Sequence, residues 1–250
     1  MDLVFYRCYI CLDVNSHLKK NMPNIKQIPP SSFEFLRLLK NNNEREWFND
    51  HKIAYQKEHA YIESFAQDLL DLMNTHDVIE TSSGKKSLYR IYRDTRFSND
   101  KTPYKTHWSG SFKRAGKQRR GGYYFHIEPG NSFVAGGFFG PSPQDLKLIR
   151  ENISFDAGPL REILNDKTFI ASFETLKGEQ LKTAPKGFDG DHQDIDLLRY
   201  KQFLLVHRFT DEEVLSKEFL GYCNQEFKNM RPFFDYMSEI LTTDANGLEL

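Results

Sequence analysis

GYYFHIEPGNSFVAGGFF, residues 122–139, contains two runs of aromatic and β-branched residues on either side of a short Glu128-Pro-Gly-Asn131 turn. In the first run, polar side chains alternate with apolar ones, which is the period of a β-strand. Two strands joined by so short a turn must be antiparallel. The sequence therefore predicts a hairpin made of strands 121–128 and 132–139.

The period of two extends upstream of this hairpin. It predicts two further strands, 87–97 and 104–114, which the loop 98–103 joins. A fifth run, QFLLVHRF at 202–209, has the length and the apolar content of another strand. We therefore expect an antiparallel β-sheet of about five strands.

Helical patterns flank the predicted strands on both sides. Ser31-Ser-Phe-Glu34 has the spacing of a capping box, and Asn43 stands where it could cap a second, long helix. Downstream, Pro143 begins a series of shorter helices, and the last one, about 211–241, is expected to kink or split at Pro232. The fold class predicted is α+β, with the sheet packed against N-terminal and C-terminal helices.

The domain organisation follows from the same pass along the chain. Residues 22–250 contain no long linker or repeat and predict one α+β domain. The segment from Met22 onward reads as a natural beginning, so residues 1–21 are expected to be a disordered extension or a misassigned start. Asp2 and the Arg7 that interrupts the apolar run exclude a secretory leader there.

Composition excludes several classes of protein. No apolar run approaches the roughly 20 residues that cross a bilayer, and three cysteines without a framework suit a reducing cytoplasm. The net charge of −1 excludes a protein that is basic throughout. Residues 85–120, however, hold twelve Lys or Arg and two Asp, hence a local charge of +10. Such a distribution favours attraction of anions at one place.

Strand alternation then places polar groups on a common surface. The facing residues of the predicted strands bring together basic side chains, two imidazoles and a carboxylate, if the strands pair in that register. Arg and Lys hold phosphate or carboxylate groups, and histidine can transfer protons near neutral pH. The predicted anion-binding residues are Arg93, Arg96, Lys101 and Lys105, supported by Asp94, Ser98, Tyr104 and Glu128, with His107 and His126 as candidate acid and base.

Three interpretations of this site stay open. The first is binding of an anion such as a phosphorylated small molecule, and the second is a metal-independent hydrolase or transferase acting on one. In the third, the Arg and Asp side chains only stabilise the loop 98–103. Nucleic acid is a less favoured partner, because the basic run 113–120 has the composition of a solvated hairpin tip. The sequence indicates no metal, cofactor or membrane partner, and no particular oligomeric state.

Four longer motifs carry a family resemblance. Arg93-Asp-Thr-Arg-Phe-Ser-Asn-Asp-Lys-Thr-Pro-Tyr-Lys105 is preceded by Asn42-Asn-Glu-Arg-Glu-Trp-Phe48 and followed by Gly122-Tyr-Tyr-Phe-His-Ile-Glu128 and Gly136-Gly-Phe-Phe-Gly-Pro141. Over roughly 30–238 the chain resembles the uncharacterised bacterial and fungal family known as domain of unknown function 2461. The resemblance implies a single domain and carries over no activity and no catalytic residues.

Overall fold

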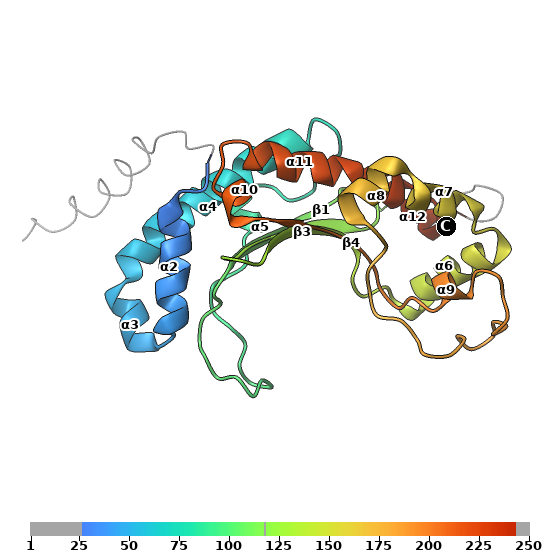
Figure 1. Ribbon diagram of the computed structural model, residues 1–250, viewed down its shortest axis with the longest axis horizontal. Coiled ribbons are helices and arrows are strands. Elements are labelled where there is room, and N and C mark those ends of the chain that lie inside the picture. Colours follow the sequence, from blue (N-terminus) through green and yellow to red (C-terminus); the bar gives the residue numbers. More distant parts are fainter. Residues whose placement is uncertain (1–26, 118, 244–250) are drawn as a thin grey trace, which may run out of the picture.

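A computed structural model describes residues 27–117 and 119–243. The interpretation of residues 1–21 and of Met22 as a start lies outside the described residues. Figure 1 shows helices along one side of a curved sheet. The helices are α2 (Pro30–Asn41), α3 (Arg45–Asp50), α4 (Lys52–Met73), α5 (Gly84–Ser87), α6 (Pro143–Phe155), α7 (Gly158–Asn165), α8 (Lys167–Phe173), α9 (Ile195–Leu198), α10 (Asp211–Val214), α11 (Phe219–Asn229) and α12 (Arg231–Thr242).

The sheet confirms the predicted α+β class and the hairpin at its centre. Its strands run β1 (Trp108–Lys113), β2 (Gly122–Ile127), β3 (Ser132–Phe138) and β4 (Phe203–Phe209), in that order and antiparallel throughout. In the described part of the chain the sheet has four strands, where about five were expected. The missing one is 87–97.

Residues 89–107 form an arm that leaves the sheet instead of extending it (Figure 1). Its two segments are joined by sparse backbone bonds, such as Lys105 N to Ile91 O at 2.7 Å and Arg93 N to Pro103 O at 2.9 Å. A two-stranded ribbon is marginal by itself, and Pro103 lacks an N–H to donate. The predicted strand 87–97 therefore reduces to isolated bridges, and the strand predicted at 104–114 begins only at Trp108.

One face of the sheet carries the core. Phe112, Tyr123, Phe125 and Val134 are at most 1% exposed and point toward the helices. Phe65 of α4 lies edge-on to Phe125, with ring centroids 5.8 Å apart. Burial of each such side chain contributes about 1.5–3 kcal/mol. The described helices gather on this side, so the opposite face of the sheet is left without a helical cover (Figure 1).

Both edges of the sheet are bridged by short extended segments. Beside β1, Leu88 pairs with Gly110 and Ile79 pairs with Arg114. Beside β4, Lys177 and Leu204 exchange two backbone hydrogen bonds of 2.8 and 2.9 Å. The outer strands thus have part of their backbone N–H and C=O groups satisfied within the chain.

The N-terminal helices begin differently from the prediction. α2 starts with Pro30 in its first turn and has no side-chain cap, so the predicted Ser31 capping box is wrong. Proline has the helical φ that the first position needs. The hydroxyls of Ser31 and Ser32 instead donate to the Glu58 carboxylate on α4, at 3.0 and 2.8 Å. These bonds attach α2 to α4.

Asn43 does not cap the second helix. Its Nδ2 donates to the Tyr104 carbonyl at 2.9 Å, and the Tyr104 N–H donates to its Oδ1 at 3.0 Å. The predicted long helix consequently starts later and divides into α3 and α4 around His51. Asn43 therefore anchors the arm to the N-terminal helices.

The C-terminal helices include the predicted break at Pro232. The predicted helix 211–241 consists of α10, α11 and α12, and Pro232 lies in the first turn of α12. No described helix is both long and apolar enough to span a bilayer.

A buried ion pair joins three parts of the fold. Arg114, 1% exposed, donates from Nε to Asp77 at 2.7 Å and from Nη2 to Asp235 on α12 at 2.7 Å. The Tyr123 hydroxyl donates to the same Asp77 carboxylate at 2.7 Å. Burial alone would raise the pKa of Asp77, but the hydrogen bonds from Tyr123 and Arg114 outweigh it and lower that pKa. Asp77 therefore stays ionised, and it links the end of α4, the sheet and α12.

Candidate functional site

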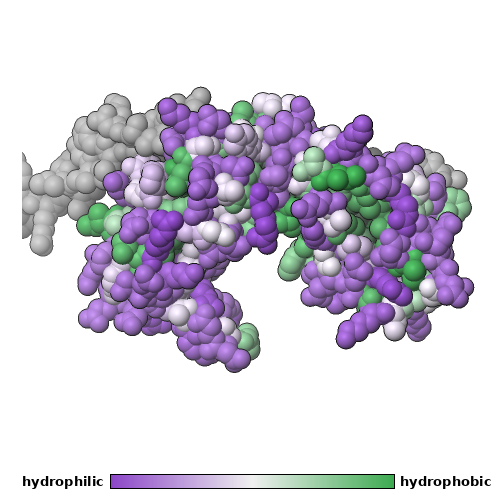
Figure 2. Space-filling view, in the orientation of Figure 1, coloured by the Kyte–Doolittle hydropathy of each residue, from purple (hydrophilic) through white to green (hydrophobic). Residues whose placement is uncertain are grey.

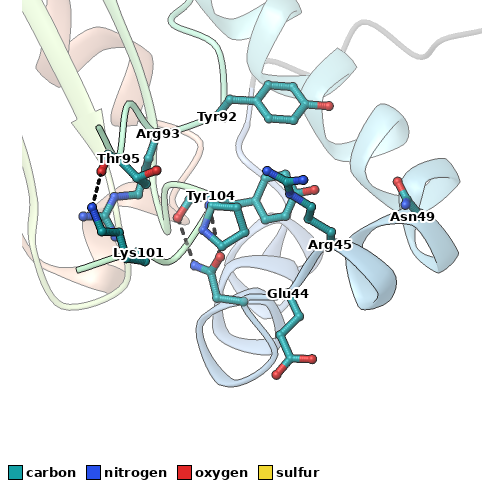
Figure 3. A pocket seen from close by; sticks show the side chains of 10 residues that line it. Glu44, Arg45, Asn49, Tyr92, Arg93, Thr95, Lys101 and Tyr104 are labelled. Atoms are coloured by element: carbon teal, nitrogen blue, oxygen red, sulfur yellow. Dashed lines mark hydrogen bonds between the residues drawn. The ribbon is translucent and has the colours of Figure 1, made fainter. Parts of the chain in front are cut away.

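The arm and the N-terminal helices enclose a polar pocket of about 580 Å³. Figure 3 shows Arg93, Thr95 and Lys101 on the arm, with Glu44 and Arg45 on the helical side. Tyr104 lies between them, held by Asn43 and stacked on Phe48 with ring centroids 4.0 Å apart. Tyr104 is thus a buried aromatic residue that packs the arm against the N-terminal helices.

We expect Asn43→Ala to loosen the arm. The change removes two hydrogen bonds to the Tyr104 backbone, each worth about 1 kcal/mol. The equilibrium constant for local opening of residues 89–107 should therefore rise roughly ten-fold or more. Trypsin cleavage at the arm's Lys and Arg residues, followed by mass spectrometry, measures this opening. Asn42→Ala is the matched control, because the Asn42 side-chain amide donates locally to Leu38 O of α2. Equal cleavage of both variants would contradict the anchoring role.

Most of the predicted anion-binding side chains are engaged within the arm. Arg96 forms a two-pronged pair with Asp94 at 3.0 and 2.7 Å and is 77% exposed. Lys101 Nζ donates to the Thr95 carbonyl at 2.8 Å (Figure 3). Arg93 donates to Asp100 and to Thr102. The contacts of Arg96 and Lys101 support the interpretation in which these side chains stabilise the arm.

Hydrogen bonds within the arm also determine the charge of its acids. The Thr102 backbone N–H and the Arg93 guanidinium lower the pKa of Asp100 to about 2. Hydrogen bonds from Arg96 lower the pKa of Asp94. Ser98 contributes a backbone bond of 3.4 Å to Thr95 O that closes the tip. Both acids of the arm are therefore paired with its arginines.

Lys105 differs from Arg93 and Arg96, which pair with Asp100 and Asp94. Within residues 27–117 and 119–243, no carboxylate lies within ion-pair distance of its ammonium group, which lies 5.4 Å from the centre of the Tyr89 ring. Burial, and then the neighbouring Arg90, lower its pKa. Lys105 lines a second pocket of about 460 Å³ together with Lys40, Asn43, Arg93, Asp100, Thr102, Tyr104, Thr106 and His107. We call this the anion pocket.

Two further predicted residues, His126 and Glu128, lie next to His107, which lines the anion pocket. The register pairs Trp108 with Ile127 and Ser109 with His126, so His107 stands beside Glu128 on the face that His126 shares. The rings of His107 and His126 are 4.1 Å apart, and His126 Nε2 lies 3.0 Å from Glu128 Oε2. We call these three residues the His/Glu cluster. The predicted coincidence of the polar faces of the two strands is correct here.

Burial dominates the titration of this cluster. Burial, and then the adjacent His126, lower the pKa of His107 to about 4, although Glu128 opposes the shift. Burial also lowers the pKa of His126, although Glu128 opposes the shift. For Glu128, burial raises the pKa, but the hydrogen bonds from Asn131 and His126 outweigh burial and lower it. At neutral pH the cluster therefore contains two neutral imidazoles and one carboxylate.

The structure thus divides the predicted site in two. Arg93, Lys105, His107, His126 and Glu128 lie in or beside the anion pocket. Arg96, Asp94, Lys101 and Ser98 belong to the tip of the arm. Sequence reasoning missed Lys40, at the end of α2, and the anchoring role of Asn43. The signal available for Asn43 was the Asn42-Asn-Glu-Arg-Glu-Trp-Phe48 motif that contains it.

An apolar groove of about 630 Å³ continues from this site across the uncovered face of the sheet. Tyr89 connects the two, because its ring faces Lys105 and its hydroxyl donates to Ser111 at 3.1 Å. In Figure 2 the outline of the molecule is hollowed on this side, between the arm and the C-terminal helices. The groove is lined by Tyr89, Tyr124, Phe133, Ala135, Phe139, Leu204 and Val206, among others.

The basic run 113–120 has a different character. Lys113 pairs with Glu80 at 3.0 Å, Arg120 pairs with Asp145 at 2.6 Å, and Arg114 is in the buried network. These acids offset the positive charge that a nucleic-acid backbone would contact. The run therefore gives little support to a nucleic-acid interface.

Comparison with known proteins places this arrangement in a family. No curated protein and no solved structure matches the chain. One family model, described as conserved hypothetical protein (DUF2461), matches residues 31–236 and so includes the N-terminal helices, the arm, the sheet and the first half of α12. The chain therefore belongs to the DUF2461 family of conserved hypothetical proteins.

Proposed function

We propose that the protein binds a small organic anion, with its phosphate or carboxylate group in the anion pocket and its apolar part in the adjoining groove. The observation that carries this proposal is Lys105, a half-buried ammonium group without an acidic partner among the described residues. A desolvated cation that lacks a counter-charge gains more from a bound anion than an exposed, paired one does.

The composition of the pocket wall supports an anionic ligand. The wall contains three cationic side chains, Lys40, Arg93 and Lys105, and a single carboxylate, Asp100. Arg93 and Thr102 already donate hydrogen bonds to that carboxylate. The Thr106 hydroxyl and the Asn43 amide add polar groups at the same wall. Charge-assisted hydrogen bonds from such groups are roughly twice as strong as neutral ones.

The neighbouring groove supports an organic rather than an inorganic ligand. Its lining is mainly aromatic and aliphatic, and it begins at Tyr89, the residue that also faces Lys105. Ligand sites in proteins combine such an apolar surface with a few convergent polar groups. A ligand with an acidic head and a flat apolar body matches both parts.

We expect phenyl phosphate to bind more tightly than inorganic phosphate, and Lys105→Ala to weaken phenyl phosphate binding by about 10- to 100-fold. Loss of one hydrogen bond to a charged group costs about 1.5–3 kcal/mol, which corresponds to that range. Isothermal titration calorimetry in buffer containing EDTA measures both affinities and keeps metal ions out of the comparison.

Arg96→Ala is the matched control for this experiment, because it removes a cation of the arm that is exposed and already paired with Asp94. Its affinity for phenyl phosphate should equal that of the wild-type protein. If Arg96→Ala weakens binding as much as Lys105→Ala does, the ligand lies at the tip and the assigned pocket is wrong. If the wild-type protein binds neither probe, the interpretation of the cations as purely structural is correct.

A further inference from the structure

The His/Glu cluster brings together three groups that metal ions bind. One donor atom from each of His107, His126 and Glu128 lies within 4.8 Å of the others. His126 Nε2 and Glu128 Oε2, 3.0 Å apart, already have the separation of two ligands on one ion, since bonds of about 2.1 Å place neighbouring ligands about 3–3.5 Å apart.

We propose that His107, His126 and Glu128 form a binding site for a divalent transition-metal ion. Two imidazoles and a carboxylate are a ligand set that suits Zn²⁺ and Fe²⁺. Three protein ligands also leave coordination positions open, which distinguishes a reactive or ligand-binding centre from a closed structural one. In this assignment the imidazole lone pairs bind the ion, and the two histidines are not the acid and base that the sequence suggested.

Hydrogen bonds around the cluster orient the proposed ligands. His126 presents Nε2 to Glu128, and its other nitrogen, Nδ1, lies 3.0 Å from the Tyr124 hydroxyl. Glu128 accepts from Asn131 Nδ2 at 2.8 Å and from Thr106 at 3.3 Å. Partners of this kind select the tautomer of a metal-bound histidine and hold a ligating carboxylate in place. His126 and Glu128 therefore already have supporting contacts of the kind that metal ligands have.

The position of the cluster explains why a metal would be useful there. His107 lines the anion pocket beside Lys105, so an ion bound to His107 lies at the wall of that pocket. A divalent ion adds positive charge where Lys105 lacks a partner, and its open positions can accept an oxygen of a bound phosphate or carboxylate. The metal site does not depend on this use, because its ligands are arranged without the anion.

Sequence patterns alone could not have revealed this site. Of the three proposed ligands, only His126 and Glu128 are close together in the sequence, and one such pair is too few for a metal-binding motif. The third ligand comes from the adjacent strand, and its position follows from the β1–β2 register. The assignment therefore differs from the sequence interpretation, which predicted no metal.

The test measures metal binding directly on the purified full chain after treatment with EDTA and buffer exchange. Calorimetric titration with Zn²⁺ should give one ion per chain, and Co²⁺ should give visible d–d absorption. His107→Ala and Glu128→Gln should each weaken Zn²⁺ binding by at least about 100-fold. Tyr124→Phe should still bind one Zn²⁺ per chain, but with about 10-fold lower affinity, since the change removes only a contact that orients His126.

His59→Ala is the matched control, because His59 is another half-buried histidine but lies outside the cluster. It should bind Zn²⁺ as the wild-type protein does. Circular dichroism in EDTA establishes that each variant is folded, and the isosteric Glu128→Gln keeps the test decisive if His107→Ala is unfolded. Failure of the folded wild-type protein to bind Zn²⁺ or Co²⁺, or binding that Glu128→Gln leaves unchanged, would overturn the proposal. Titration of phenyl phosphate in EDTA tests the anion pocket separately.

Discussion

Arg114→Met is expected to lower the free energy of unfolding by about 3–5 kcal/mol, the usual cost of removing one partner of a buried ion pair. The side chain is 1% exposed, and its loss leaves the Asp77 carboxylate in the interior without its closest cation. The more distant Arg231 and Arg119, 3.6 and 3.8 Å from Asp77, offset only part of the loss. Urea unfolding monitored by circular dichroism measures the change.

The double variant Asp77→Asn/Arg114→Met tests whether the loss of stability comes from the pair itself. Because the two side chains bond each other, removing both should cost less than the sum of the single changes. Arg96→Met, which breaks an exposed pair on the arm, is the control and should leave the urea midpoint unchanged. A single Arg114→Met change of less than about 1 kcal/mol would show that the network does not stabilise the junction of α4, the sheet and α12.

Gly137→Ala is expected to be the second most damaging substitution, with a loss of about 2–5 kcal/mol. Gly137 has φ 132°, a backbone conformation that costs side chains about 1–3 kcal/mol. A Cβ atom there would also lie 2.1 Å from the Phe203 carbonyl oxygen, so β3 and β4 would have to move apart. Thermal and urea unfolding should both show the loss.

Gly140→Ala provides the control for Gly137→Ala. Gly140 belongs to the same glycine-rich segment, but a Cβ atom at Gly140 would have no neighbour within 4 Å. Its substitution should leave stability within about 0.5 kcal/mol of the wild-type value. Similar effects of both substitutions would mean that β4 does not require the close approach at Gly137.

The parts of the fold that could be predicted from sequence are those specified by local patterns. The β2–β3 hairpin, with its Pro-Gly turn, lies within a residue or two of its expected limits. The break at Pro232 and the shared polar face of His107, His126 and Glu128 are likewise correct. The hairpin and the break are each specified by neighbouring residues of one segment, whereas the shared face follows from strand alternation only once the β1–β2 register is known.

The remaining features depend on contacts between distant residues. Asn43 has the local signature of a helix cap, yet its amide bonds Tyr104, which is 61 positions away. The alternation in 87–97 resembles that of a strand, but no core lies beneath most of it, so only bridges form. Lys40 joins the anion pocket because α2 ends beside the arm, which no local spacing encodes.

The bridged edges of the sheet restrict how a partner could attach. A free outer strand invites another chain to extend the sheet through main-chain hydrogen bonds. Here the segments at Leu88 and Lys177 occupy part of both margins, so such strand addition would first have to displace them. A ligand on the broad uncovered face would instead meet side chains, so that side-chain chemistry rather than backbone complementarity would select it there.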